Sequence, residues 1–384
     1  MRKIGFKVCA LLMVTTLAFL TFSCGGESAA PQQAQQAAGP ALAAGEIPPM
    51  IDTSLPDTPV TLRVAYDDPV LWPDTPGIAC PDPEHAFALF FKDYVESQSG
   101  GKLKVELHGI MALGTYKQTL ELVQNGSIDA NIGTGSLATF FPEIELITIP
   151  YIFGSDDIAE DFFNNSVFWA NLMDTMEEKA GFKYLAIGQN GWRNFTNDIR
   201  PIRTPDDCKG LKFRVMESPV YVRMIESLGA SAVPIAWNEV YTTLQTHVVD
   251  GHENAISSIS LGKIYEVQKY LTMDGHIWSE NLMVMNPDRY NSLPVGAQQI
   301  IKMGARLGAE ANNVADRMVS NIVNFKTIAK NMDVYYPTAA EKQKFRETTQ
   351  PAVLGYLKEK LGADVVEQFT REVQLAEART GWRR

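Results

Sequence analysis

Between residues 210 and 257, the spacing of hydrophobic residues changes back and forth between that of a strand and that of a helix. The runs 212–215 and 232–235 are short and half apolar, which predicts strands, whereas the residues between them place apolar side chains at helical spacing. Pro219 near the start of this helical stretch and Gly229 at its end are typical of helix boundaries. A second helical stretch and a third apolar run follow. This β-α-β-α-β order predicts a parallel sheet with right-handed crossovers.

Three side chains with binding chemistry fall at the carboxyl ends of these strands, where the ligands of parallel sheets gather: Arg214, Trp237 and Asn254. A guanidinium matches a carboxylate through two parallel hydrogen bonds of about 1.5–3 kcal/mol each. An indole face can cover the organic tail. The three residues therefore predict a site for a small organic acid. An internal ion pair of Arg214 with Glu217 or Glu239 is the alternative.

A second arginine precedes this stretch. Arg193 follows a strand predicted at 182–187, just as Arg214 follows a strand end, so Arg193 is a further candidate for a ligand contact. Arg200 and Arg203 lie nearby and are the alternatives for this role.

Two loops in the first half of the chain carry further candidates. Thr134 lies in the Gly-rich turn 133–136, where exposed backbone N–H groups suit anions. The alternative is a tight turn that needs small residues. Trp72 lies in the Pro-rich loop 67–83, and long loops in compact domains are often functional. Tyr66, Asp67 and Trp72 are therefore candidate site residues, with a packing role as the alternative for Trp72.

Four motifs occur in order from residue 210 onward: G-L-K-F-R-V, E-V-Y-T-T-L-Q-T, V-V-D-G-H-E-N and Y-E-V-Q-K-Y-L. Together they resemble the DctP family, the periplasmic substrate-binding proteins of tripartite ATP-independent periplasmic (TRAP) transporters. The earlier motifs S-G-G-K-L-K-V-E, L-V-Q-N-G-S-I-D-A and I-P-Y-I-F match the same family at its customary places. The resemblance covers nearly everything from residue 60 onward. His252 departs from it, because the family usually has glutamine there.

The resemblance implies an α/β, two-lobed periplasmic-binding-protein-like fold, each lobe a mostly parallel sheet flanked by helices. Lobe I is expected to comprise 60–191 with 279–320, and lobe II 192–278 with 321–384. An approximately helical stripe after Pro294 predicts a long bracing helix. About 30 residues of helix would extend roughly 45 Å.

The resemblance also implies a function, that of an extracytoplasmic solute receptor. Such a receptor captures a small organic acid by hinge closure and delivers it to the small and large TRAP membrane subunits for ion-gradient-driven uptake. By resemblance, Arg214 contacts the ligand carboxylate, Arg193 adds a polar contact, Asn254 donates a hydrogen bond and Trp237 supplies an aromatic wall. Glu217, near the expected ligand, would repel a second acidic group, which favours a monocarboxylate.

Two other function classes stay open from the sequence. A sensory or scaffold lipoprotein would bind ligand without a transport role. A metal-dependent hydrolase would use a cluster such as His247, His252 and Glu253, but no catalytic motif accompanies it, so we expect no enzyme and no cofactor. A cation that bridges to the ligand through Glu217, Glu239 or Glu253 is a further alternative.

Composition and charge narrow the partners. The chain of 384 residues is 45% hydrophobic and 21% charged, as in a soluble globular protein. Its net charge is −11 and it has no basic run, so nucleic acid is not an expected partner. An anionic ligand must then be attracted by local positive groups rather than by the overall field.

The N-terminal region reads as a sorting signal followed by a tether. Residues 1–23 combine a positively charged start with an apolar segment, as in a signal peptide. The junction S-C-G-G resembles a lipoprotein processing site, which makes Cys24 the predicted lipid anchor, with plain cleavage as the alternative. Residues 24–59 are rich in Ala, Gln, Pro and Gly and are expected to be a disordered tether. The protein is therefore expected in the periplasm, anchored to a membrane.

Four cysteines are present in the chain. Cys9 leaves with the predicted signal peptide, and Cys24 is the predicted anchor. Cys80 and Cys208 remain, in a compartment where disulfides persist, but the sequence does not establish that they meet. Neither has a neighbouring cysteine at metal-ligand spacing, so no metal site is expected.

Overall fold

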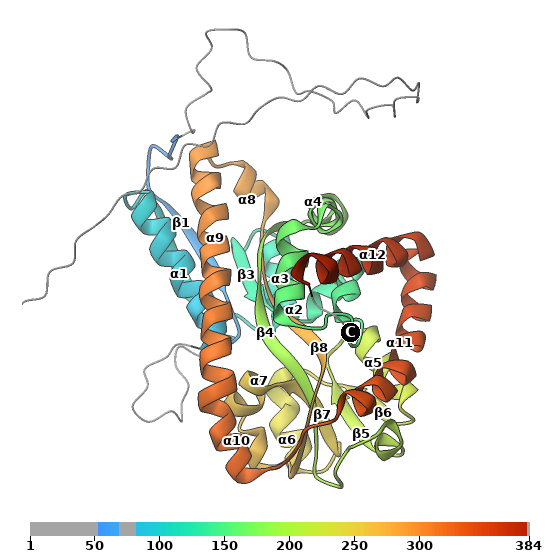
Figure 1. Cartoon of the computed structure of the whole chain (residues 1–384). Helices are drawn as coiled ribbons and strands as arrows, with labels where there is room; N and C mark the ends of the chain where they lie inside the picture. Colours follow the sequence, from blue (N-terminus) through green and yellow to red (C-terminus); the bar gives the residue numbers. More distant parts are fainter. Residues whose placement is uncertain (1–52, 69–81, 382–384) are drawn as a thin grey trace, which may run out of the picture. The chain divides into compact units, whose positions relative to one another are not determined.

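The computed structural model describes residues 53–68 and 82–381 (Figure 1). All the described residues fall in one compact unit of the chain. The predicted signal peptide and most of the predicted tether lie outside them. So do three residues singled out from the sequence: Cys24, Trp72 and Cys80.

The described strands form one nine-stranded mixed sheet in the order β2-β1-β3-β8-β4-β7-β5-β6, with β9 paired to β8. β1 pairs in parallel with β2 and β3, and β5 pairs in parallel with β6 and β7. The predicted α/β fold class is confirmed, and the two parallel groups prove to be joined in one sheet. The strands are β1 (Val60–Ala65), β2 (Leu103–His108), β3 (Ala130–Gly133), β4 (Lys183–Asn197), β5 (Lys212–Val215), β6 (Ser231–Pro234), β7 (Gly251–Ala255), β8 (Tyr270–Met285) and β9 (Asp333–Tyr335).

The long antiparallel pair β4 and β8 makes this connection (Figure 1). The strand expected to end at residue 187 continues through Arg193 to Asn197, so the prediction that Arg193 follows a strand end is wrong. Its glycines suggest a turn, but Gly191 takes a φ of 120° at a register shift, and pairing with β8 resumes beyond it. A β-bulge of this kind bends a strand without ending it.

The predicted lobe boundaries fall inside these two strands. Gly191 pairs with Ser279, and Trp192 pairs with Trp278, at the positions where the sequence divides lobe I from lobe II. The division into lobes stays a prediction, because β4 and β8 cross both boundaries without interruption.

The predicted long helix is confirmed. α9 continues through the π-helical segment η6 into α10, and α9 packs against α1 and β4 (Figure 1). None of the helices in 53–68 and 82–381 has the length and apolar character needed to cross a bilayer. The α-helices are α1 (Pro83–Gln98), α2 (Tyr116–Gln124), α3 (Asp156–Asn165), α4 (Val167–Ala180), α5 (Pro219–Ser227), α6 (Val240–Gln245), α7 (Ile256–Leu261), α8 (Pro287–Asn291), α9 (Val295–Ala315), α10 (Phe325–Asn331), α11 (Ala339–Leu361) and α12 (Ala363–Thr380). The π-helix η6 spans Asp316–Asn324, and the 3₁₀ segments are η1 (Ser136–Thr139), η2 (Pro142–Thr148), η3 (Pro205–Cys208), η4 (Trp237–Glu239) and η5 (Ile264–Glu266).

Helices on both sides of the sheet supply its cores. One hydrophobic cluster gathers side chains such as Phe162, Phe213 and Phe345, and a second includes Phe87 of α1 and Ile301 of α9. Burying a side chain of this size stabilises the fold by about 1.5–3 kcal/mol. β3 and β7 are buried along their whole length, as expected of strands covered on both faces. The cores thus hold rigid the strand ends from which the site is built.

Candidate functional site

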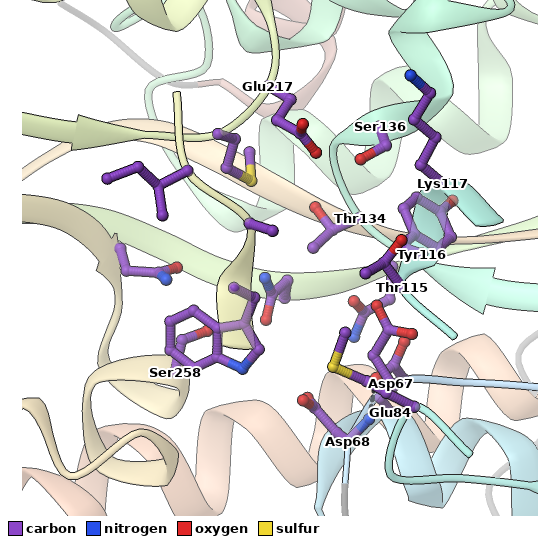
Figure 2. Close-up of a pocket in the computed structure, with 18 of the residues that line it drawn as sticks. Asp67, Asp68, Glu84, Thr115, Tyr116, Lys117, Thr134, Ser136, Glu217 and Ser258 are labelled. Carbon is purple, nitrogen blue, oxygen red and sulfur yellow. Dashed lines mark hydrogen bonds between the residues drawn. The ribbon is translucent and has the colours of Figure 1, made fainter. Parts of the chain in front are cut away.

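A small pocket with charged walls lies beyond the carboxyl ends of β1, β3 and β5, with β4, β7 and β8 contributing further wall residues (Figure 2). Its cavity measures about 90 Å³. This is well below the few hundred Å³ of pockets for drug-sized ligands, so the pocket suits a small solute. It collects Arg214, Arg193, Asn254, Trp237, Glu217 and Thr134, six of the residues predicted from the sequence.

Arg214 presents an unpaired guanidinium edge to this pocket. Its side chain is buried, with 3% of the residue exposed, and its Nε donates to the carbonyl oxygen of Ile235 at 2.8 Å. In the described part of the chain it forms no ion pair with Glu217 or Glu239, so that alternative is wrong. Burial, followed by the nearby Arg193, lowers the pKa of Arg214 to about 10. The group is still cationic at neutral pH and has donors left for an anion.

Arg193 also lines the pocket, but it is neutralised by Glu253. Its Nε donates to Oε2 at 2.6 Å, and its Nη2 donates to Oε1 at 2.9 Å and to the Glu253 carbonyl oxygen at 2.7 Å. The guanidinium also lies 5.2 Å from the ring centroid of Tyr221. Antiparallel β4 and β7 place the pair diagonally on one face, because Arg193 lies opposite Ala255 and Glu253 lies opposite Phe195. Only Nη1 is left for the predicted ligand contact.

A buried chain of charges continues behind Arg193. His276 donates from Nε2 to Glu253 at 3.1 Å, and its Nδ1 lies 2.9 Å from Asp274. Burial raises the pKa of Glu253, but Arg193 and His276 lower it to about 2. Burial lowers the pKa of His276, but Asp274 and Glu253 raise it to about 9. At neutral pH positive and negative groups therefore alternate, which fixes the orientation of Arg193.

Asn254 and Trp237 reach the pocket from neighbouring segments. Asn254 ends β7 and is 4% exposed, and its Oδ1 accepts the N–H of Ala255 at 2.9 Å. Its amide nitrogen is left as a donor at the pocket wall. Trp237 is half-buried in η4, just after β6. Both residues line the pocket, as their positions near strand ends in the sequence predicted.

The Gly-rich turn after β3 does not form an anion cradle. The N–H of Gly135 donates to Oε1 of Glu280 at 3.3 Å, and the hydroxyl of Thr134 lies 3.4 Å from the same oxygen. Glu280 is only 4% exposed, so its carboxylate already occupies these donors. The tight-turn alternative therefore describes this segment, although Thr134 still lines the pocket.

The residues considered for catalysis do not converge. His247 is exposed, whereas His252 is fully buried and its Nδ1 lies 2.7 Å from the hydroxyl of Thr196. Burial, with the charge of Arg214, lowers the pKa of His252 to about 3, so the ring is neutral. Within 53–68 and 82–381, no group of three or more His, Cys, Asp or Glu side chains is suited to a metal ion. Glu253 is committed to its partners rather than to a bridging cation.

The remaining predicted residues lie at the margins. Glu217 lines the pocket but is exposed, and Glu239 is exposed and outside the pocket lining. Cys208 is buried and forms no disulfide with any residue in 53–68 and 82–381. Its pairing with Cys80 stays an open question, since Cys80 lies outside the described residues.

The sequence analysis identified Asp67 as a candidate but missed the acidic wall that Asp67 forms with Asp68 and Glu84, whose charge is opposite to that of the arginines in the same pocket. Figure 2 shows their carboxylates gathered beside Tyr116. Asp67 and Asp68 come one residue after the end of β1, and the N–H of Asp68 donates to Oε2 of Glu84 at 2.9 Å. Glu84 lies in the first turn of α1, after the N-cap Asp82. Two adjacent aspartates at a strand end were the available signal.

Burial governs the protonation of this acidic wall. It raises the pKa of Asp67 to about 8, with Asp68 adding to the shift. It raises the pKa of Asp68 to about 6, although hydrogen bonds with Asp82 and Glu84 oppose it. Burial and the neighbouring carboxylates also raise the pKa of Glu84 and Asp82 well above their usual range. These groups repel one another because water cannot screen them.

Comparison with known proteins agrees with this geometry. The family described as bacterial extracellular solute-binding protein, family 7 (DctP), matches residues 79–360. A solute-binding protein of Verminephrobacter eiseniae is 36% identical over 223 residues, covering 58% of this chain and 66% of that protein. The 2,3-diketo-L-gulonate-binding periplasmic protein YiaO of Escherichia coli is 32% identical over 240 residues, covering 62% of this chain and 72% of YiaO.

Solved structures show the same architecture. A TRAP periplasmic solute-binding protein from Desulfovibrio salexigens with bound orotic acid superposes with a TM-score of 0.75 at 27% identity, covering 82% of this chain and 99% of that one. The sugar acid binding protein DctPAm from Advenella mimigardefordensis, in complex with galactonate, gives a TM-score of 0.75 at 28% identity, covering 83% and 99%. Both proteins bind small organic solutes.

Proposed function

The chain belongs to bacterial extracellular solute-binding protein family 7, and from this premise we propose that it captures a small monocarboxylate for a TRAP transporter. Arg214 binds the ligand carboxylate in this proposal, with Asn254 and Nη1 of Arg193 as further donors and Trp237 as the wall. The family is one of extracytoplasmic solute receptors rather than enzymes.

The observation that carries the proposal is the state of Arg214. A buried guanidinium is normally paired, yet its only hydrogen bond in the described residues is to a backbone carbonyl. A ligand carboxylate would supply the missing partner bidentately. Arg193, by contrast, is already neutralised, so it adds a donor without adding net charge.

The ligands of related proteins support an acid as the solute. Structures of relatives contain succinate, pantoate, D-erythronate and galactonate, and curated relatives are described as binding sialic acid or ectoine. These ligands differ in size and in substituents. An acid group is the feature that most of their names share, which suits a site built around one free guanidinium.

Capture by hinge closure follows from where the pocket residues originate. Asp67 and Thr134 come from the β1–β3 group, Arg214 from the β5–β7 group, and β4 and β8 connect the two groups. A ligand that contacts both groups favours a closed state by its differential affinity for that state. The closed receptor would then deliver the acid to the membrane subunits, held near the membrane by a lipid on Cys24.

The test is a thermal-shift and calorimetric screen of small monocarboxylates and dicarboxylates. We expect the acids that stabilise the wild-type protein to lose about 2–5 kcal/mol of binding free energy with Arg214→Ala. Arg306→Ala is the control, since Arg306 is exposed on α9. Equal stabilisation of wild type and Arg214→Ala would refute the carboxylate site. Uptake by reconstituted membrane subunits would separate a transport receptor from a sensory lipoprotein.

A further inference from the structure

We propose that the acidic wall of this pocket binds a positively charged nitrogen of the ligand, so that the captured solute is a zwitterion. One end would be the carboxylate on Arg214, and the other an ammonium, amidinium or similar cationic group. The inference rests on the proposed carboxylate contact and adds a second, oppositely charged pole to it.

The acidic wall is built from separate elements that converge. Asp67 and Asp68 follow β1, Glu84 opens α1, and Tyr116 opens α2. In Figure 2 Asp67, Asp68 and Glu84 lie together below Tyr116, whereas Glu217 lies on another side of the pocket. Glu84 is 3% exposed, so bulk water does little to stabilise its charge.

No basic side chain compensates these carboxylates in the described residues. None of the ion pairs in 53–68 and 82–381 includes Asp67, Asp68 or Glu84. Lys117 lines the pocket, but Figure 2 shows its amine directed away from them. The neighbouring His85 is bonded to the hydroxyl of Tyr66 at 2.6 Å, and burial lowers its pKa, so it does not supply a charge.

Tyr116 provides an independent indication of a ligand. The residue is 5% exposed and lines the pocket, and its hydroxyl has no hydrogen-bond partner among the described residues. Oδ1 of Asp67 is also buried and finds no partner within 53–68 and 82–381. Buried polar atoms are normally hydrogen-bonded. An ammonium donates up to three hydrogen bonds and accepts none, which suits the acceptor atoms of Asp67 and Tyr116 that are left over in this wall.

Two other occupants fit this wall less well. A metal ion is disfavoured, because the described residues contain no His, Cys, Asp and Glu group suited to one. A neutral polyol would hydrogen-bond to the carboxyl groups but would not offset the repulsion that arises when more than one of them is ionised. A cationic nitrogen satisfies the acceptors and also cancels that repulsion, so it is the occupant that the charges favour.

The experiment compares matched ligands on the wild-type protein by calorimetry. The series runs from β-alanine through γ-aminobutyrate to ε-aminocaproate, each against the hydroxy acid of the same length, together with guanidino and quaternary ammonium carboxylates. At the chain length that spans the pocket, we expect the cationic ligand to bind at least about tenfold more tightly than its hydroxy counterpart.

Two variants test whether the acidic wall causes the preference for the cationic ligand. Glu84→Gln and Asp67→Asn keep the shape of the side chain and remove its charge, and both are expected to abolish the preference for the cationic ligand. Glu217→Gln is the matched control, because Glu217 lines the same pocket away from the acidic wall. Should a buried variant fail to fold, calorimetry of the wild-type protein in buffers of different ionisation enthalpy replaces it. Cationic ligands are then expected to release protons, and hydroxy acids are not.

The outcomes separate the two proposals. If carboxylates bind in an Arg214-dependent way with equal affinity for cationic and hydroxy forms, the zwitterion inference is overturned and the proposed function stands. If no cationic or neutral carboxylate binds, or if binding ignores Arg214, the proposed function itself fails. Preferred binding of the neutral hydroxy acids would also overturn the inference.

Discussion

The pocket has a basic wall, formed by Arg193 and Arg214, and the acidic wall of Asp67, Asp68 and Glu84. The two walls differ in how their buried charges are stabilised. On the basic wall, Arg193 and Glu253 neutralise each other at 2.6 Å, whereas Arg214 has no carboxylate partner in the described residues and keeps its charge for a ligand. On the acidic wall, Asp67 and Glu84 have no basic partner in the described residues, and burial raises their pKa instead. The charge of the basic wall is therefore fixed, whereas the charge of the acidic wall depends on pH and on the bound ligand.

The origin of the two walls explains the difference. Arg193 and Glu253 project from hydrogen-bonded neighbours, β4 and β7, so the sheet itself sets their distance. The acidic groups come from a segment after β1 and from the start of α1. Groups held by a sheet keep a permanent charge pair in place, whereas a cluster of like charges is stable only when protonated or neutralised.

Breaking the Arg193–Glu253 ion pair should have the largest effect on the free energy of unfolding. Glu253→Gln leaves Arg193 and His276 as buried charges without their shared carboxylate. We expect the free energy of unfolding to fall by about 3–5 kcal/mol, measured by urea denaturation. Glu310→Gln, which removes the exposed partner of Arg306, should change it by no more than about 0.5 kcal/mol. A loss as small as that control would show that the network is not a stability element.

The acidic wall should make the ligand-free fold less stable as pH rises. Carboxyl groups whose pKa is raised on folding stabilise the fold fully below their ordinary pKa and lose that contribution as pH rises through the raised value. For Asp68 and Asp67 these values are about 6 and about 8. We expect urea denaturation to give a free energy of unfolding lower at pH 8 than at pH 5 by on the order of 2 kcal/mol.

The variant Asp67→Asn separates the contribution of Asp67 to this pH dependence from that of His276. His276, whose pKa is raised to about 9, also loses its contribution as pH rises from about 6.5 to 9, in the same direction. The Asn variant keeps that part and the parts of Asp68 and Glu84, so the stability should fall less steeply with pH, and an unchanged slope would contradict the acidic-wall assignment. Other titratable or charged groups that face or neighbour the wall are Tyr66, Asp82, Glu84, His85, Tyr116, Lys117 and Glu280.

Glu217 should have the smallest effect of the pocket acids, because it is exposed and water screens its charge. With Glu217→Gln we expect calorimetric affinity for monocarboxylates to change by less than about threefold, and affinity for dicarboxylates to rise by a similar factor. The control is Glu226→Gln, an exposed residue of α5 paired with Arg223. A tenfold change would place Glu217 in contact with the ligand.

The local features of the basic wall were predictable from the sequence. Strand 212–215 is β5 residue for residue, and the long helix after Pro294 forms as expected. Arg214, Trp237 and Asn254 all reach the pocket, since parallel strands carry their carboxyl ends to one edge. Apolar periodicity and helix-boundary residues encode such features within a few neighbouring positions.

Only the tertiary structure decided the charge state of the pocket. The sequence does not reveal that Arg193 sits inside a strand and meets Glu253 sixty positions later, because the glycines before it resemble a turn. Nor does it bring Asp67 and Glu84 together and bury them beside Tyr116. Desolvation and charge pairing depend on contacts between distant segments, and a residue's own neighbours in sequence carry little information about either. The sequence alone determined which chemical groups reach the pocket, and folding decided which of them keep a charge to offer.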